Sequence, residues 1–167
     1  MADRRLWTLL ATLVLGGAVA VLVAQSGLVY HVVPPDPEYE RTTVTTYDAD
    51  GTELAAVDVR IADTRARRWL GLSATDDLPA GEGMLFVHDA EREHTYVMRN
   101  MSFGLDIVFV DADGRVRTVH HAPAPDDGAD RSYAGRAKWV LEVPLGWTNE
   151  TGLDPGDRVA VPRTLSS

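Results

Sequence analysis

One uncharged run constrains this chain more than any other feature. Leu6 to Tyr30 reads LWTLLATLVLGGAVAVLVAQSGLVY and contains no acidic or basic residue. At a rise of 1.5 Å per residue, about 20 apolar residues cross the roughly 30 Å hydrocarbon core of a bilayer. Arg4 and Arg5 precede the run, and basic residues stay in the cytoplasm. The sequence therefore predicts a cytoplasmic N-terminus at residues 1–5 and a single-pass transmembrane helix or signal anchor at residues 6–30, with the remainder of the chain outside the cell membrane.

A cleaved signal peptide is the competing interpretation of the same run. Ala24-Gln25-Ser26 has the small-x-small pattern of a cleavage site, although the run is longer than the usual apolar region of a signal peptide. Both interpretations place the C-terminal part of the chain on the same side of the membrane. Residues 31–41 contain three prolines and predict a stiff, extended spacer between the membrane and a domain.

The remaining chain has room for one domain with one core. Of the 167 residues, about 130 come after the apolar run, which is the size of an ordinary single domain. The sequence predicts this domain over residues 42–163, with a short polar tail at residues 164–167.

Short runs of alternating or β-branched residues predict a β-rich domain. Strands are expected at residues 42–47, 53–61, 84–87, 95–99, 105–111, 115–121, 138–143 and 158–161. Two short helices are expected at residues 64–72 and 146–151. The predicted fold is α+β and mainly β: a compact curved sheet or partial barrel with one or two short helices, preceded by one transmembrane helix.

The segments between these strands carry three further expectations. Asp63 or Thr64 caps the first helix, whose buried face is formed by Trp69, Leu70 and Leu72. Residues 88–93 are a charged connection, and residues 122–136 are a surface loop. The two Asp-Ala-Asp-Gly segments, 48–51 and 111–114, are hairpin turns.

The charge and cysteine content exclude several classes of function. The formal net charge is −9, and Lys138 is the only lysine among 16 basic residues. An acidic, lysine-poor surface is typical of a protein adapted to high salt, so a halophilic source is expected, the alternative being an ordinary acidic protein from a GC-rich genome. Nucleic acid is excluded as a partner, because its recognition needs a basic surface. The absence of cysteine excludes disulfides, thiolate catalysis and zinc–thiolate sites.

Several linked motifs of the chain resemble a known family. They are Gly71-Leu72, the segment 82–87 (EGMLFV), Met98-Arg99-Asn100, the segment 105–111 (LDIVFVD), the segment 140–147 (VLEVPLGW) and Gly156-Asp157-Arg158. Their order and spacing resemble those of domain-of-unknown-function family 192 over roughly residues 57–161. The resemblance implies a compact β-dominated domain, often exported or anchored, and supplies no mechanism. The family commonly has a Trp-Met pair where this chain has Val97-Met98 and Thr where it has Met101, so a family pocket using those side chains has a different shape here.

The densest polar group beside apolar strands is Arg99, Asn100 and Asp106. Arg99 offers a rigid fork of donors suited to carboxylates or phosphates, and Asn100 both donates and accepts. These three residues are therefore candidate ligand-binding residues. The alternative is that Asn100 and Asp106 bind loop backbone and fix the turn between two strands, or that Asp106 pairs with Arg99.

Glu82 and Glu142 are two further candidate ligand-binding residues, each beside apolar strand residues. If the two carboxylates lay close together, burial and repulsion would separate their pKa values and suit them to acid–base work. The alternative is that each is partnered by an arginine or by backbone donors.

No metal site or cofactor is predicted. His88, His94, His120 and His121 do not follow a recognised ligand spacing, and they are expected to be solvated, with the last two on opposite faces of a strand. The Asp-Ala-Asp-Gly turns match only part of a calcium loop. Asn149 lies in a glycosylation sequon and is a candidate modification site in an exported protein.

These observations predict a membrane-anchored extracytoplasmic domain that binds a small ligand, glycan or envelope partner without catalysis. No catalytic motif appears in the sequence, and no catalytic residue is assigned. A carboxylate-dependent hydrolase using Glu82, Asp106 or Glu142 with Arg99 is one alternative. A purely structural envelope protein is the other.

Overall fold

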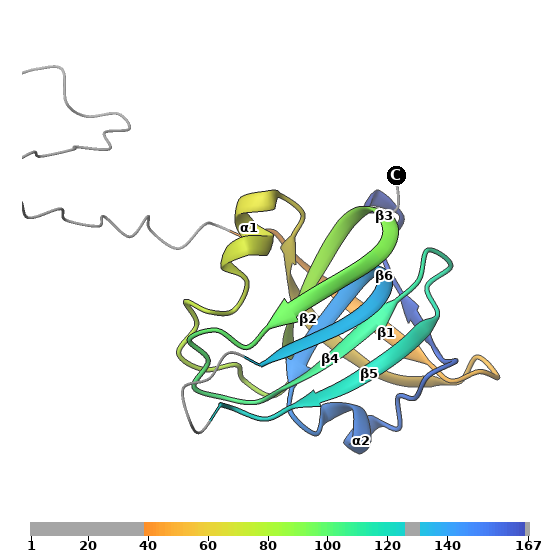
Figure 1. Cartoon of the computed structure of the whole chain (residues 1–167). Helices are drawn as coiled ribbons and strands as arrows, with labels where there is room; N and C mark the ends of the chain where they lie inside the picture. Colours follow the sequence, from red (N-terminus) through yellow and green to blue (C-terminus); the bar gives the residue numbers. More distant parts are fainter. Residues whose placement is uncertain (1–38, 126–130, 166–167) are drawn as a thin grey trace, which may run out of the picture. The chain divides into compact units, whose positions relative to one another are not determined.

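The domain is a single strongly curled sheet with two short helices, as predicted from the sequence. The computed structural model describes residues 39–125 and 131–165. The strands are β1 (Arg41–Tyr47), β2 (Glu53–Ala62), β3 (Glu82–Val97), β4 (Leu105–Val110), β5 (Val116–Ala122), β6 (Ser132–Pro144) and β7 (Arg158–Ala160). The helices are α1 (Arg65–Leu70), α2 (Trp147–Thr151) and a 3₁₀ turn (Arg163–Leu165). Figure 1 shows their arrangement.

The part of the chain that the structure describes contains no helix both long and apolar enough to cross a membrane. The predicted transmembrane segment, residues 6–30, and most of the predicted spacer lie outside the described residues, so both stay predictions.

The sheet has the strand order β5-β4-β6-β3-β2-β1-β7 and curls toward closure. Pairing is antiparallel except between β2 and β3, which are parallel and joined by a crossover containing α1. At one end, an isolated bridge between Arg115 and Arg158 brings the two outer strands together. Three backbone bonds reinforce this closure, one of which runs from Val116 N–H to the Asp157 carbonyl. The result is a half-barrel that meets at one end.

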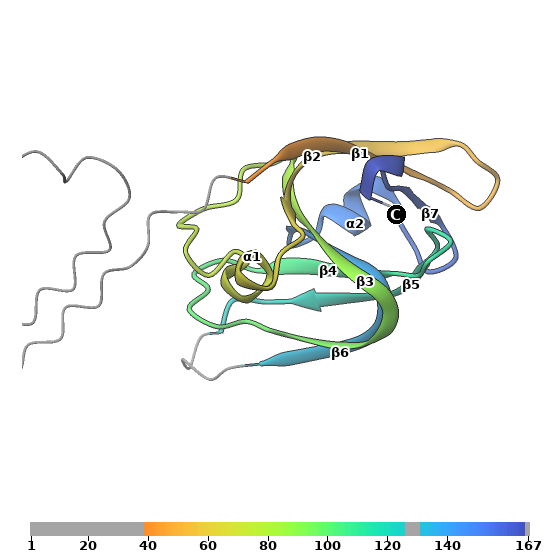
Figure 2. The same cartoon turned by 90° about the horizontal axis from the view of Figure 1, so that it is seen from above.

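Two cores lie on opposite faces of β4. All six residues of β4 are buried, because successive side chains point alternately to the two faces. Val108 and Val110 join a core with β1, β2, β7 and α2. Ile107 and Phe109 join a second core with parts of β3 and β6. Figure 2 shows β3 and β6 curving from the layer of β1 and β2 around to the far side of β4 and β5.

The long strand β3 corrects two sequence predictions. Residues 84–87 and 95–99 were expected as separate strands joined by a charged connection at 88–93, but β3 runs unbroken from Glu82 to Val97. The pairing with β6 shifts register between Val87 and Arg92, which is an irregularity typical of a β-bulge. The charged residues are accommodated because Asp89, Arg92 and Glu93 remain exposed to solvent and Glu91 is partly exposed.

Strand β6 also extends further than predicted. It begins at Ser132 rather than Lys138, since its first residues, 132–137, pair with residues 92–97, the outer half of β3. Gly135 permits this hairpin to fold onto the sheet, because a Cβ at that position would lie 2.7 Å from the ring of Phe109. The predicted loop at 122–136 is correspondingly shorter.

Candidate functional site

A cavity of about 250 Å³ opens between the outer half of β3, α1 with the loop that follows it, and the floor of the sheet. Arg68 to Ser73 supply one wall and His94 to Arg99 supply the other. Glu142, Phe86 and Leu105 reach it from the sheet. The cavity therefore lies at the edge of the second core.

Strand alternation directs Glu142 toward this cavity. Its neighbours across the sheet are Met84 on β3 and Ile107 on β4, and both belong to the second core. Glu142 is 6% exposed, and burial raises the pKa of its carboxyl to about 8. No side chain or backbone group of the described residues donates a hydrogen bond to it or pairs with it. At neutral pH the cavity thus contains a largely protonated carboxyl that can both donate and accept.

Two histidines and a tyrosine form a neutral wall beside Glu142. The rings of His88 and His94 stack with centroids 3.5 Å apart, and His88 Nε2 lies 2.9 Å from the hydroxyl of Tyr96. Burial and the neighbouring His94 lower the pKa of His88 to about 4. Burial and Arg92 also lower the pKa of His94. Both imidazoles are therefore neutral at pH 7.

His94 carries a second unpartnered group. Its Nε2 is buried and has no hydrogen-bond partner among the described residues. The pKa of the Tyr96 hydroxyl is raised, mainly by burial and also by Glu142. The sequence prediction that His88 and His94 are solvated is wrong, because the bend in β3 turns their side of the strand inward.

Two arginines and a tryptophan border the cavity. Arg68 donates to the Asp63 and Val87 carbonyls, the latter at 2.7 Å. Arg99 donates to the Trp69 carbonyl at 3.1 Å, and its guanidinium lies 4.7 Å from the centre of the Trp69 ring. Neither arginine forms an ion pair with a carboxylate of the described residues.

The position of Trp69 contradicts the sequence prediction. It was predicted on the buried face of the first helix, yet the residue is 69% exposed. Helix α1 spans only Arg65–Leu70, with Thr64 as its N-cap. Gly71 ends it at a φ of 53°, and Leu72 just after this turn is buried, as predicted. Trp69 is left outside, stacked on Arg99.

Of the five candidate ligand-binding residues, the structure brings Arg99 and Glu142 to the cavity and places the other three elsewhere. Glu82 pairs with Arg41 at 3.4 Å. Asn100 is exposed in the loop after β3 and has a φ of 54°. Glu82 and Glu142 do not meet in the cavity.

Asp106 lies on the opposite face of the sheet from Glu142. Residues 106, 108 and 110 of β4 share one face, which packs toward α2. The Asp106 carboxylate accepts from the backbone N–H of Gly146 at 3.1 Å, and from the N–H and hydroxyl of Thr148, each at 2.8 Å. His121 Nδ1 lies 2.8 Å away on the other oxygen. Asp106 thus holds backbone, as in one predicted alternative, but that of α2 rather than the turn after β3.

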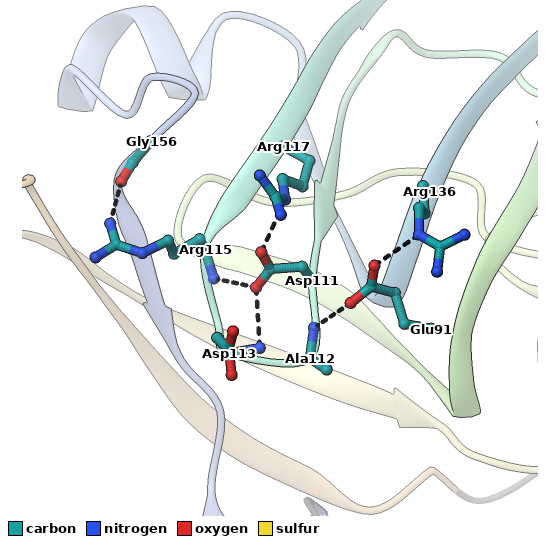
Figure 3. A network of polar contacts seen from close by, with 8 residues as sticks. All are labelled: Glu91, Asp111, Ala112, Asp113, Arg115, Arg117, Arg136 and Gly156. Atoms are coloured by element: carbon teal, nitrogen blue, oxygen red, sulfur yellow. Dashed lines mark hydrogen bonds and ion pairs between the residues drawn. The ribbon is translucent and has the colours of Figure 1, made fainter.

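The second Asp-Ala-Asp-Gly turn is held by its own side chains and by a neighbouring strand. Asp111 accepts from the N–H groups of Asp113 and Arg115 and pairs with Arg117 at 2.8 Å. Glu91 on β3 accepts from Ala112 N–H and from the Arg136 guanidinium (Figure 3). These carboxylates serve the turn and the bend of β3.

Neither the histidines nor the carboxylates of the described residues form a group of three or more that could hold a metal ion. His120 and His121 point to different partners, the Ala134 carbonyl and Asp106. Asn149 is exposed on α2, and its glycosylation stays a prediction.

The comparisons with known proteins identify the family and the fold. Residues 45–161 match the family model DUF192, described as "Uncharacterized ACR, COG1430". A protein of unknown function from Novosphingobium aromaticivorans DSM 12444 is 31% identical, with a TM-score of 0.67 over 76% of this chain and 89% of that one. A candidate transcription regulator from Sinorhizobium meliloti 1021 is 28% identical, with a TM-score of 0.67 over 75% and 96%. None of the curated proteins compared with the chain matches it.

Proposed function

The chain belongs to the DUF192 family of uncharacterised proteins, and on that premise we propose that it is a membrane-anchored extracytoplasmic domain whose cavity binds a small organic molecule. Binding occurs between α1, the outer half of β3 and Glu142. No reaction is part of the proposal.

The observation that carries the proposal is the unpartnered carboxyl of Glu142. Buried polar groups in proteins are nearly always hydrogen-bonded, and burying a carboxyl without a partner costs free energy. Such groups gather at functional sites, where a ligand supplies the missing partner. Glu142 faces an open cavity rather than a closed core, so a bound molecule can reach it.

The size of the cavity favours a small molecule over an extended glycan. Ligand pockets span roughly 300–1,000 Å³, and this cavity, at about 250 Å³, lies just below that range. Its lining supplies apolar surface from Phe86, Met98 and Leu105, with a few polar groups that fix orientation. A molecule of about the size of a single sugar or a short acid is the expected occupant.

The hydrolase alternative has less support. It used two carboxylates with Arg99, and the cavity holds only Glu142 of the three acidic residues considered. Asp106 faces the other core, and Glu82 is engaged with Arg41. Binding needs no second carboxylate, so it accounts for the arrangement with fewer requirements.

The cellular placement rests on sequence alone. The uncharged run of residues 6–30 and the preceding Arg4-Arg5 support an anchor with the domain outside. Protease treatment of intact cells producing the full chain with a C-terminal epitope tests this. Loss of the epitope supports the placement, and its protection until lysis refutes it.

The binding proposal is tested on the full chain purified in detergent at high salt. A library of small organic molecules is screened by the shift in melting temperature, since a ligand that binds only the folded state raises it. Hits are repeated on Met101→Trp, which enlarges a side chain that lines the cavity, and on Glu53→Gln, which changes an exposed strand residue elsewhere. Hits that vanish in Met101→Trp and persist in Glu53→Gln support the site. Hits that persist in both, or a screen without hits, refute it.

A further inference from the structure

The cavity carries an unusual charge for this chain. The protein has a net charge of −9, with 25 acidic residues, yet the charged groups lining the cavity are the arginines Arg68 and Arg99. Arginine in an acidic protein is ordinarily matched by carboxylates, as Arg67 is by Asp63 at 2.8 Å. In the described part of the chain, no carboxylate pairs with either lining arginine.

Resting on the proposed function, we infer that the ligand is a small organic anion whose charged group meets Arg99 at the rim and whose apolar part lies against the second core. Arg99 donates one N–H to the Trp69 carbonyl. The remaining N–H groups of its fork have no acceptor among the described residues, and such a fork matches a carboxylate in two parallel bonds.

The groups that face the cavity add no negative charge at neutral pH. His88 and His94 on β3 are neutral, because burial lowers the pKa of each. Tyr96 on β3 stays protonated, and Glu142 on β6 is largely protonated. The two arginines, from α1 and the loop after β3, leave the site with a net positive charge. An anion is attracted and an ammonium group is repelled.

The apolar lining distinguishes an organic anion from an inorganic one. Phe86, Met98 and Leu105 are each at most 2% exposed and line the cavity together with Leu72. Inorganic phosphate has no apolar part that could be buried against this surface. A chain of a few methylene groups gains affinity for each one it buries, roughly fourfold per group.

Glu142 links the binding of an anion to a proton. Its neutral form adds no charge to the cavity, whereas its ionised form repels an anion. With a pKa of about 8 for Glu142, the fraction of protein able to accept an anion falls about tenfold between pH 7 and pH 9. The two histidines are neutral throughout this interval, and the arginines stay charged.

The experiment compares matched probes on the full chain in detergent at fixed salt. Hexanoate, hexanamide and hexylamine share a body and differ in charge, and inorganic phosphate lacks the body. Dissociation constants are measured by ligand-observed NMR at pH 7. We expect hexanoate to bind about tenfold more tightly than hexanamide, the ratio of one additional charged hydrogen bond, and hexylamine and phosphate not to bind.

Two variants test the residues. Arg99→Leu should weaken hexanoate about tenfold and leave hexanamide unchanged. Arg65→Leu removes the same charge from an exposed position of α1 outside the cavity and should change neither. Glu142→Gln should bind hexanoate equally at pH 7 and pH 9, while the wild type weakens about tenfold over that interval.

The outcomes separate the two proposals. Equal binding of hexanoate and hexanamide, with no effect of Arg99→Leu, overturns the anion and leaves the small-molecule site standing. Absence of binding by all four probes overturns the inference. If the library screen also yields no hit that Met101→Trp abolishes, the proposed function fails with it. A wild-type affinity for hexanoate that is constant from pH 7 to pH 9 overturns the role of Glu142.

Discussion

Replacing Asp106 by leucine should destabilise the domain severely. Asp106 is fully buried, and one of its oxygens accepts from three donors at the start of α2, on Gly146 and Thr148. A leucine has a similar size and accepts nothing. Leaving a buried donor unsatisfied costs roughly 1–3 kcal/mol. The two Thr148 donors are buried and the Gly146 N–H is partly buried, so the expected loss is about 3–5 kcal/mol. A whole domain is stable by only about 5–15 kcal/mol.

Asp106→Asn separates charge from hydrogen bonding. Asparagine can turn its carbonyl oxygen toward the α2 donors and its NH₂ toward His121, so it should lose about 1–2 kcal/mol. His121→Ala removes the single donor on the other oxygen. Since that histidine side chain is about half exposed, its loss should cost less than about 1 kcal/mol.

The assay is urea unfolding of the full chain in detergent at constant salt, followed by tryptophan fluorescence. Trp147 begins α2 beside Thr148 and is 8% exposed, so it reports on this contact directly. A loss below about 1 kcal/mol for Asp106→Leu would refute the reasoning, since even one orphaned donor costs more. Equal losses for leucine and asparagine would also refute it, because the oxygen would then be irrelevant. Asp106→Asn should leave ligand affinity unchanged, and a large change would return Asp106 to the binding site.

Three further predictions concern other positions. Gly135→Ala places a Cβ 2.7 Å from the Phe109 ring and should cost about 1–3 kcal/mol of unfolding free energy by overpacking, with partial recovery when Phe109→Leu is added; an uncorrected double variant would contradict this. Glu142 has a raised pKa of about 8, so between about pH 4.5 and pH 8 the folded state binds a proton that the unfolded state has lost, and the free energy of unfolding falls as the pH rises. The urea midpoint of Glu142→Gln should therefore exceed that of the wild type at pH 8 and converge with it near pH 5. Parallel pH profiles of the two proteins would refute the raised pKa. Glu91→Gln weakens the acceptor of the Ala112 N–H, so hydrogen exchange at that amide should accelerate, and an unchanged rate would show that the turn holds itself.

Much of the sheet follows from local pattern. The alternation in residues 42–47 and 53–61 and the Asp-Ala-Asp-Gly turn between them predict the hairpin that the structure contains. Residues 105–110 read as apolar on both faces, and they are buried on both because β4 lies between two cores. The alternation of buried and exposed residues along a strand and the residue types of a turn depend only on neighbouring residues, so both can be predicted from the sequence.

The bend of β3 follows from pairing between distant segments. Residues 88–93 are polar and read as a connection, yet Arg92 and Glu93 pair with Ala137 and Arg136 on β6. These partners are more than 40 residues away in sequence, so the composition of residues 88–93 alone does not predict the pairing. Once the strand is known to continue, His94, Tyr96 and Met98 alternate with exposed Thr95 and Val97. This alternation was the available signal for the wall of the cavity.

Only part of the candidate site was predicted, because its residues are also brought together by pairing between distant segments. Arg99 and Glu142 lie 43 positions apart, and both line the cavity only because β6 pairs with β3. Asp106 was grouped with Arg99 because the two are close in sequence. In β4, however, every second residue points to the same face, so Asp106 shares the α2 face with Val108 and Val110. Ile107 and Glu142 lie on the other face. Distance along the chain is a weak guide to the face of a sheet.

The parallel pairing of β2 and β3 has a consequence for how this family can diversify. A parallel connection has to carry the chain back across the sheet, here through residues 63–81. That returning segment supplies one wall of the cavity, and it forms no strand of the sheet. Substitutions, insertions and deletions there can alter what the cavity accepts while the strand ladder stays intact. If the proposed function holds, relatives can share the same half-barrel and differ in the molecule that the cavity binds, because changes in the crossover leave the strand pairing intact.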